Sequence, residues 1–455
     1  MKGTLVTGDG RTAVAAVSID TRTIGAGDAF IAIRGERFDG AAFAGAAVEK
    51  GAVVIVVPRG WAPAGAAVGA AVIEVDDTTT ALQSLANTIR RESGTKVVAI
   101  TGSAGKTTTK EVTSELLSTR YRVIRNRGNF NNHIGLPLSL IELRERPEIA
   151  VVELGMNHAG EISTLVRVAE PDVRVWTNVG EAHLGFFASV DAIADAKAEV
   201  MEQATASTVL VANADDDRIA ARAPAFAGRV VTFGIDRPAD VQASDVVDRG
   251  IEGTTATVTT RHGRTAIATP LIGRGNLANL LAATAVAVEF DVPLDVIAER
   301  TKSLLPAAHR GEVLQLAGGV TVIDDSYNAN PTATRRALDV LARSARSGSS
   351  RKVAVLGEML ELGDRSVALH EDVGRAAARI GVDRLVTVGG APAAAMAAAA
   401  VAAGLSQSQV EHFPTSEAAA DAVAAEVRRG DLVLVKGSRG VKTDRVVERL
   451  KADGN

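Results

Sequence analysis

The segment 97–109 constrains the fold of this chain most, because it joins an apolar run to a glycine-bearing loop and then to a helix start. It reads VVAITGSAGKTTT. Glycines let backbone N–H groups turn towards phosphate oxygens, and the helix N-terminus adds a partial positive charge. Lys106 can then reach the terminal phosphates, and Thr107 can ligate magnesium. We therefore expect a strand, an ATP-binding loop and a helix. The expected loop residues are Gly102, Ser103, Ala104, Gly105, Lys106, Thr107 and Thr108.

This loop is a variant of the pattern G-x-x-x-x-G-K-[ST], because Ile100 stands where the first glycine belongs. The alternative is an ordinary strand-to-helix turn with a solvated lysine. The apolar run before the loop and its Gly-Lys-Thr-Thr ending favour phosphate binding, since this context is what such a motif requires.

From residue 96 onward, short apolar runs alternate with helical patterns, which is typical of a parallel sheet with crossover helices. The runs lie at 97–100, 149–152, 173–176, 208–212, 320–323, 353–356, 385–388 and 432–435. Residues 254–271 alternate with period two around a turn at 262–263, which predicts a hairpin at the sheet's edge. Earlier in the chain, 29–33 and 53–57 predict strands and 78–91 predicts a helix. The predicted fold class is α/β.

The length of 455 residues suggests about three domains at roughly 150 residues each. Ser93 and Gly94 offer a hinge, and a third block of strands begins near Gly319. We expect domains at 1–93, 94–315 and 316–455.

Composition excludes several classes of protein. A net charge of −4 gives no global electrostatic reason to bind nucleic acid or anionic lipid. The absence of cysteine excludes disulfides, thiolate zinc sites and a cysteine nucleophile. The N-terminus lacks the pattern of a signal peptide, so we expect a cytoplasmic protein. The apolar run 391–404 is shorter than the roughly 20 residues of a membrane span and contains Pro392, so we expect a soluble helix there.

Glu153 ends the apolar run 149–152, and ligands of open parallel sheets bind outside the carboxyl ends of strands. A hard cation that bridges phosphates needs such an oxygen ligand. The alternative is a carboxylate that caps a helix beginning near His158, and the sequence leaves both open. His183 follows the run 173–176, but a single histidine is more often structural.

Lys197 falls within an apolar helical stripe. The other members are Val190, Ile193, Ala194, Val200 and Met201. Desolvation disfavours a charged amine, which makes it available for chemistry or modification. A snorkelling lysine at the edge of the stripe is the alternative.

Two polar clusters complete the pattern. Residues 128–135 contain three amides in four positions, suited to sugar or peptide recognition, although composition alone favours a turn-rich loop. Residues 324–330 place two carboxylates and two amides directly after an apolar run, where helix capping is the alternative. Lys436 ends another such run.

These motifs in this order resemble the Mur ligases, and most closely the MurF family of UDP-N-acetylmuramoyl-tripeptide:D-alanyl-D-alanine ligases. Besides the loop, the resemblance is carried by residues 20–22, 34–40, 128–135, 153–158, 178–184, 213–215, 324–331, 356–363 and 436–439. The stretches DSYNANP and GEMLELG are typical of MurF rather than of its relatives.

The resemblance implies a UDP-sugar-binding domain, a central P-loop ATPase domain of mostly parallel sheet, and a Rossmann-like C-terminal domain that closes over the nucleotide. It implies that ATP phosphorylates the terminal carboxylate of UDP-N-acetylmuramoyl-tripeptide. The amine of D-Ala-D-Ala then attacks the acyl phosphate, a step of peptidoglycan synthesis and cell-wall biogenesis that supports cell shape and division. Lysine and diaminopimelate both stay open as the third residue of the tripeptide.

The resemblance also implies roles for particular residues. The expected catalytic residues are Lys106, Glu153, His183 and Lys197. Magnesium is expected on Thr107, Glu153, His183 and Lys197 as a carbamate. Further nucleotide contacts are expected from Asn279, Arg310 and Asp325. The UDP substrate is expected to contact Asp20, Thr21, Arg22, Asn129, Asn131 and Asn132. D-Ala-D-Ala and closure are expected to involve Tyr327, Asn328, Asn330, Lys436, Ser438 and Arg439.

The chain departs from the family at two positions: Gly275 replaces a usual histidine, and Gly185 replaces a usual glutamate after His-Leu. Two alternatives stay open, a sister ligase or folylpolyglutamate synthetase-like amide ligase, and a nucleotide-dependent switch protein. We expect a monomer without a nucleic-acid partner or membrane insertion.

Overall fold

The computed structural model describes residues 3–35, 38–61, 69–344 and 351–453. Glu36 and Arg37 of the motif 34–40 lie outside the described residues. The chain forms two compact units: Met1–Ala99 with Arg122–Met156 and Gly160–Asp172, and Ile100–Tyr121 with Asn157–Ala159 and Val173–Asn455.

The first sheet has five strands in the order β1-β5-β4-β3-β2. Their bounds are β1 Gly3–Thr7, β2 Val17–Ser18, β3 Ala29–Ile31, β4 Val54–Pro58 and β5 Ala71–Val75. The central strands pair in parallel, as the continuous apolar run of β4 predicts, and β1 runs antiparallel to β5. Helix α1 (Ala44–Glu49) packs its alanines on the core that contains Phe30 and Ile55. Both strands expected in this region are confirmed.

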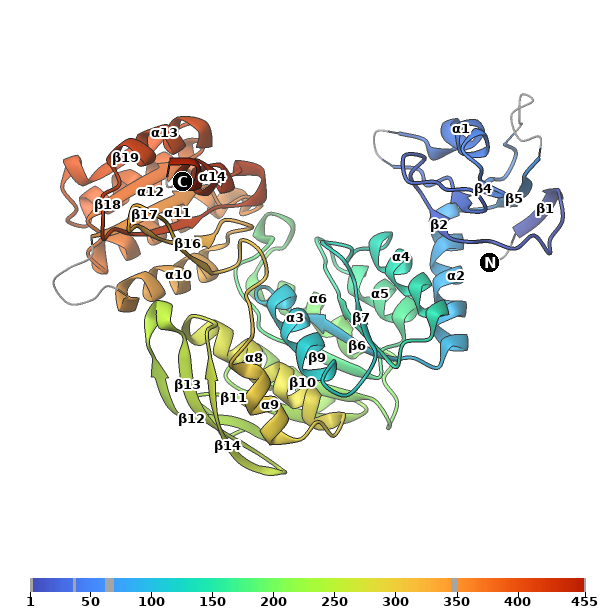
Figure 1. The fold of residues 1–455 in the computed structure, drawn as a ribbon, viewed down its shortest axis with the longest axis horizontal. Coiled ribbons are helices and arrows are strands. Elements are labelled where there is room, and N and C mark those ends of the chain that lie inside the picture. The colour runs from blue at the N-terminus through green and yellow to red at the C-terminus, as the bar shows by residue number, and fades with distance from the viewer. Residues whose placement is uncertain (1–2, 36–37, 62–68, 345–350, 454–455) are drawn as a thin grey trace. The chain divides into compact units, whose positions relative to one another are not determined.

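Helix α2 (Thr78–Ser93; Figure 1) has a capping residue at each end. Asp77 accepts a hydrogen bond from the N–H of Thr80 at 2.6 Å, and Gly94 ends the helix in the left-handed region.

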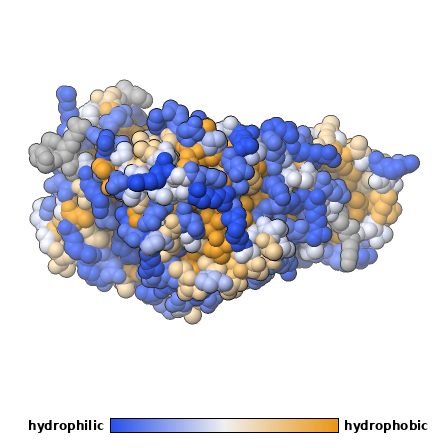
Figure 2. Space-filling model, turned by 90° about the horizontal axis from the view of Figure 1, so that it is seen from below, coloured by the Kyte–Doolittle hydropathy of each residue, from blue (hydrophilic) through white to orange (hydrophobic). Residues whose placement is uncertain are grey.

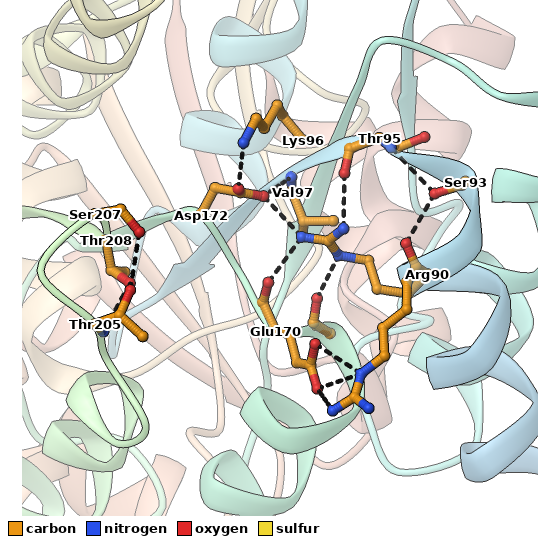
Figure 3. A network of polar contacts seen from close by, with 12 residues as sticks. Arg90, Ser93, Thr95, Lys96, Val97, Glu170, Asp172, Thr205, Ser207 and Thr208 are labelled. Atoms are coloured by element: carbon orange, nitrogen blue, oxygen red, sulfur yellow. Dashed lines mark hydrogen bonds and ion pairs between the residues drawn. The ribbon is translucent and has the colours of Figure 1, made fainter.

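Arg90, near the end of α2, ties the helix to the chain that follows α5 (Glu161–Ala169) (Figure 3). Its guanidinium donates to the carbonyls of Thr95, Ala169 and Glu170 and forms an ion pair of 2.7 Å with Asp172. The side chain of Arg90 is largely buried, so α2 is firmly attached to this part of the first unit.

The second sheet has nine strands in the order β14-β13-β12-β11-β10-β9-β6-β8-β7. Their bounds are β6 Lys96–Thr101, β7 Val123–Arg125, β8 Ile149–Glu153, β9 Val173–Trp176, β10 Val209–Asn213, β11 Arg229–Gly234, β12 Val241–Asp248, β13 Thr254–Thr260 and β14 Gly263–Thr269. The strands β9, β10, β11 and β12 pair in parallel, whereas β13 and β14 form the expected antiparallel hairpin at the edge.

Seven α-helices of the described chain accompany these strands. They are α3 Lys106–Leu117, α4 Gly135–Ile141, α5 Glu161–Ala169, α6 Val190–Ala198, α7 Asp217–Arg222, α8 Gly273–Glu289 and α9 Leu294–Thr301. Helix α8 is rich in alanine and leucine, is buried along most of its length and packs against α3.

The third sheet has six strands in the order β15-β16-β20-β17-β18-β19. Their bounds are β15 Glu312–Gln315, β16 Thr321–Asp325, β17 Lys352–Gly357, β18 Arg384–Val388, β19 Val410–Phe413 and β20 Leu432–Lys436. All pair in parallel except β15, which runs antiparallel to β16. This sheet begins with β15, whereas the third block of strands was expected to begin near Gly319.

The helices of the third block form layers with its sheet (Figure 1). They are α10 Pro331–Ser344, α11 Ser366–Arg379, α12 Ala391–Ala402, α13 Ser416–Glu426 and α14 Asp444–Asp453. Helices α13 and α14 pack on a valine-rich face of the sheet. Helix α12 packs so closely on α11 that a Cβ at Gly374 would lie 2.1 Å from the carbonyl oxygen of Met396. Only glycine fits at this contact. The predicted α/β class and Rossmann-like third block are confirmed.

The surface drawn in Figure 2 mixes hydrophilic regions with smaller hydrophobic patches. Within the described ranges, no helix combines the length and apolar character needed to cross a membrane. Most of the alanine-rich run 391–404 forms α12 (Ala391–Ala402), which begins with Ala391 and Pro392.

Candidate functional site

The predicted phosphate loop connects the end of β6 to the start of α3. Gly102 and Gly105 have φ values of 154° and 79°. The value at Gly105 lies in the left-handed region, so the loop needs glycine at that residue. Gly105 is the N-cap of α3, and Lys106 donates through Nζ to the carbonyl of Gly102 at 2.9 Å. A loop that closes onto a helix N-terminus in this way is suited to bind phosphate.

The segment after β9 holds the loop in shape. Asn178 accepts from the N–H of Ala104 at 2.9 Å and donates to its carbonyl at 2.8 Å. Thr177 also donates to that carbonyl, at 3.0 Å. Ser103 and Gly180 exchange hydrogen bonds of 2.9 and 3.2 Å. Asn178 was noted in the sequence only as part of the motif 178–184, and its role in holding Ala104 was missed.

Asn279 lies directly behind the loop, on α8. A Cβ added to Gly105 would lie 2.3 Å from Oδ1 of Asn279, so only glycine leaves room for this amide. Asn279 donates to Oδ1 of Asn276 at 3.2 Å, and Asn276 donates to the carbonyl of Ile272 at 3.0 Å. The structure thus brings this predicted nucleotide residue to the loop.

In the first unit, Glu153 is buried at the carboxyl end of β8. Its N–H donates to Oδ1 of Asn126 at 3.0 Å, and its Oε1 accepts from Nδ2 of Asn131 at 2.8 Å. Helix α5 begins only at Glu161, with Gly160 as its N-cap. The alternative in which Glu153 caps a helix near His158 is therefore wrong.

The other members of the asparagine cluster have different surroundings. Asn132 accepts from the N–H of Gly135 at 2.8 Å, beside the first turn of α4. Asn129 is exposed and accepts from the N–H of Asn131 through its carbonyl at 2.7 Å. The cluster thus combines local turn bonds with one long-range bond to Glu153.

Lys197 is 2% exposed, on the buried face of α6 with Ile193 and Ala194. A snorkelling surface lysine is therefore excluded. The helix passes into a 3-10 turn at Glu199–Met201, earlier than the stripe predicts. Arg174, itself buried on β9, donates to the carbonyl of Val200 at 2.7 Å and holds that turn against the sheet. Burial lowers the pKa of Arg174 to about 10.

His183 has a φ of 60° and lies with Nδ1 2.6 Å from Oε2 of Glu361. The hydrogen bond from His183 lowers the pKa of Glu361. Next to it, the N–H of Gly185 donates to the carbonyl of Glu361 at 2.8 Å. A Cβ at Gly185 would lie 3.1 Å from the nitrogen of Gly363, so glycine permits this close approach. Glu361 had been noted only as part of a motif, and its pairing with His183 was missed.

The ends of β16 and β20 bring Asp325 and Lys436 together. The two residues are partners in the parallel register, and Nζ lies 2.6 Å from Oδ2. Lys436 is buried and also donates to the carbonyl of Asn328 at 3.0 Å. The two polar strand ends noted in the sequence therefore form one cluster.

Tyr327 lies in the same cluster, with the guanidinium of Arg310 4.2 Å and that of Arg439 5.8 Å from its ring centre. Ser438 donates to the carbonyl of Ala329 at 3.3 Å. Asn330 accepts from the N–H of Ala333 at 2.8 Å, which is the capping role the sequence left open.

Asp20 and Arg22, expected on the UDP side, form an exposed ion pair of 2.6 Å. The side-chain hydrogen bond from Arg22 lowers the pKa of Asp20 to about 2. Lys50 donates to the carbonyl of Thr21 at 2.8 Å.

Within the part of the chain that the structure describes, no three His, Asp or Glu side chains form a group that could hold a metal ion. The expected magnesium ligands include only two such side chains, Glu153 and His183. The other two are the hydroxyl of Thr107 and a carbamate of Lys197. The buried carboxylate of Glu153 at a strand end has the oxygen chemistry that magnesium requires.

Comparison with known proteins gives three consecutive matches to family models. Residues 13–90 match the Mur ligase family catalytic domain, 100–287 the Mur ligase middle domain, and 309–439 the Mur ligase glutamate ligase domain. The chain is 36% identical to the UDP-N-acetylmuramoyl-tripeptide--D-alanyl-D-alanine ligase of Bacillus subtilis, over 99% of this chain and 96% of that protein. It is 34% identical to the Escherichia coli ligase of the same name, over 96% and 94%.

Solved structures agree with these matches. MurF from Acinetobacter baumannii has a TM-score of 0.87 at 33% identity, covering 96% of this chain and 94% of that one. MurF from Thermotoga maritima in complex with ADP has a TM-score of 0.85 at 29% identity, covering 97% and 98%. A folylpolyglutamate synthase from Mycobacterium tuberculosis reaches 0.63 at 17% identity over 83% and 95%, which is similarity of fold alone.

Proposed function

This chain belongs to the MurF ligases of the Mur ligase family, and we propose that the residues described above carry out its reaction. It is an ATP-dependent ligase that adds D-Ala-D-Ala to UDP-N-acetylmuramoyl-tripeptide in peptidoglycan precursor synthesis. The observation that carries this conclusion is the 36% identity to a curated ligase of that name over nearly the whole chain. Folylpolyglutamate synthase is much less similar, at 17% identity.

We assign ATP binding to the loop residues 102–108 with Asn279, Arg310 and Asp325. The support is the loop's closure onto α3 and the contact position of Asn279 behind Gly105. Lys106 places a positive charge beside the loop, where it can stabilise charge on the transferred phosphoryl group.

We assign magnesium to Thr107, Glu153, His183 and a carbamate of Lys197. When bound, magnesium would neutralise charge on the phosphates as the substrate carboxylate attacks. Asn131 orients Glu153, and the fold of α6 buries Lys197, where a carbamate would supply two oxygens.

We assign the UDP sugar and its peptide to Asp20, Thr21, Arg22 and the asparagine cluster. We assign D-Ala-D-Ala to the strand-end cluster of Tyr327, Asn328, Asn330, Lys436, Ser438 and Arg439. The support for the second assignment is the convergence of β16 and β20, with buried Lys436 beside Asp325. The reaction is proposed to take place in the cytoplasm, on a monomer.

We also propose three domains, at 1–93, 94–315 and 316–455; the three separate sheets support the number of domains, and β15 of the third sheet lies just before the last boundary, at Glu312–Gln315. The third domain is useful to catalysis only if it closes on the nucleotide. Small-angle scattering with and without ATP and UDP-substrate together tests this, because identical profiles would contradict closure.

ADP formation tests the function itself. ADP is expected only with UDP-N-acetylmuramoyl-tripeptide present, at a rate that rises on addition of D-Ala-D-Ala. Lys106→Ala is expected to abolish it without unfolding the protein, because the side chain faces the loop rather than a core. Lys96→Ala is the control, since Lys96 is exposed and pairs with Asp172. ADP formation that ignores the carboxylate substrate would instead indicate a nucleotide-dependent switch.

A further inference from the structure

His309 and Asp324 form a hydrogen-bonded pair at the carboxyl end of β16. Nδ1 of His309 lies 2.7 Å from Oδ2 of Asp324, whose side chain is fully buried, whereas the side chain of His309 is 32% exposed. The other oxygen of Asp324 accepts from the hydroxyl of Ser326 at 2.6 Å. Because a carboxylate only accepts hydrogen bonds, Nδ1 is the donor, and Nε2 carries the lone pair.

The backbone of His309 adopts an unusual conformation. Its φ is 60°, in the left-handed region that residues other than glycine rarely adopt. The carbonyl of His309 accepts from the N–H of Tyr327 at 3.1 Å, and the N–H of Gly311 donates to the carbonyl of Asp324 at 2.9 Å. Bonds on both sides thus fix the histidine beside the loop that follows β16. Such locally strained residues are often found at functional sites.

The surroundings of His309 are charged. Arg310 follows it and stacks on Tyr327, while Asp324 and Asp325 lie on β16. Glu312 on β15 is the antiparallel partner of Asp324. The histidine therefore borders the strand-end cluster that we assign to D-Ala-D-Ala.

This geometry suits a step that the ligase reaction requires. The dipeptide arrives with an ammonium group, which has no lone pair, so a proton must leave before nitrogen can attack. We propose that His309 is the general base that removes this proton, with Asp324 as the residue that positions its ring. The inference rests on the proposed assignment of the dipeptide to this cluster.

The step balances as follows in protons and electrons. Nε2 takes one proton from the ammonium group and becomes part of an imidazolium. The freed nitrogen lone pair forms the bond to the acyl carbon, and the carbon–oxygen bond to phosphate breaks with its electron pair on phosphate. The second proton of the nitrogen passes to the departing phosphate as the amide forms.

Two nucleophiles separate this role from a structural one. D-Ala-D-Ala is charged near neutral pH, whereas hydroxylamine is largely uncharged there and can capture the acyl phosphate without a base. With the full chain, ATP, magnesium and UDP-N-acetylmuramoyl-tripeptide, His309→Ala is expected to lower kcat/KM for the dipeptide by about 10²-fold. Hydroxamate formation is expected to stay close to wild type, which also shows that the variant is folded.

Two further measurements test whether His309 acts as a base. Added imidazole, or a higher pH that supplies free amine, is expected to restore part of the dipeptide reaction of His309→Ala. Asp324→Asn is expected to lower kcat for the dipeptide while leaving its KM and hydroxamate formation unchanged. His262→Ala is the control, because His262 is exposed in the β13–β14 turn.

Equal loss with both nucleophiles would overturn the proposal, since it would place His309 in the fold or in the phosphoryl step. Unchanged turnover of the dipeptide by His309→Ala would overturn it as well. Failure of the proposed function is a separate result: the wild-type protein would then form neither ADP with the dipeptide nor hydroxamate.

Discussion

Asn131 donates a hydrogen bond through Nδ2 to Oε1 of Glu153 at 2.8 Å, so an amide of the asparagine cluster orients the carboxylate at the end of β8. In the proposed magnesium site, this hydrogen bond from Asn131 holds the Glu153 carboxylate in place. Asn131→Ala is expected to raise the magnesium concentration needed for half-maximal ADP formation by about 10-fold. Glu153→Gln is expected to raise it further, because the charge is lost. Gln407→Ala, at an exposed amide of the third block, is the control, and a magnesium titration that neither Asn131→Ala nor Glu153→Gln changes would refute the ligand role.

Gly105 and Gly94 form a matched pair for testing the loop. Both have left-handed backbones, with φ of 79° and 72°, but a Cβ meets Asn279 at 2.3 Å only at Gly105, whereas Gly94 faces open space. Gly94→Ala is expected to cost roughly 1 kcal/mol of stability and to keep activity. Gly105→Ala is expected to cost more, and to lower ADP formation by about 10²-fold because Asn279 and the loop are displaced. Thermal unfolding and ADP release measure the two effects, and equal activity of both variants would contradict the tight packing.

Lys197 allows a test of the carbamate. Lys197→Ala is expected to be nearly inactive, and acetate is expected to restore part of its activity by occupying the vacated oxygen positions. Lys197→Arg is expected to resist rescue, because a permanent cation fills the same buried space. Lys110→Ala removes another deeply buried lysine, which pairs with Glu111 at 3.2 Å, and acetate is expected to have no effect on it. Equal rescue of all three variants would rule out a specific carbamate.

His370 makes stability depend on pH. Its Nε2 accepts from the N–H of Met359 at 2.8 Å inside the third block, and burial lowers the pKa of His370 below its ordinary value of 6.5. The unfolded chain therefore binds a proton near pH 6.5 that the folded chain excludes, so this contribution to stability is present above that pH and is lost as pH falls below it. The slope is at most about 1.4 kcal/mol per pH unit.

This pH dependence is checked by measuring the midpoint of thermal unfolding as a function of pH. The proteins compared are wild type, His370→Gln and the exposed control His262→Gln. Wild type and the control are expected to lose stability between about pH 6.5 and 5.5, and His370→Gln is expected to lose less. Parallel curves for all three proteins would show that another group titrates.

The sequence predicted the elements whose signals are local. The runs around Ile55 and Ile100 became strands because continuous apolar stretches suit buried parallel sheets, and the predicted helix 78–91 became α2, which Asp77 and Gly94 cap. The short strand β2 and the antiparallel pairing of β1 were not predicted. They depend on a partner strand rather than on a pattern of their own.

The same division applies to the candidate site. The loop and the burial of Lys197 could be predicted from spacing along the chain, because both lie within one element. The hold of Asn178 on Ala104 and the pairing of His183 with Glu361 could not, since each joins residues far apart in sequence. A polar residue just after a buried strand was the available signal for Asn178.

Arg90 has a consequence for how this protein can exchange parts with its relatives. Its bonds to Thr95, Ala169, Glu170 and Asp172 make α2 inseparable from the segment that follows it (Figure 3). A chimera with its crossover at residue 93 would combine an Arg90 from one parent with acceptors from another. Recombination is better tolerated before Thr78, where the helix and its acceptors are inherited together. In a chimera, α2 therefore belongs with the segment that follows it, although in sequence it lies between the first and second sheets.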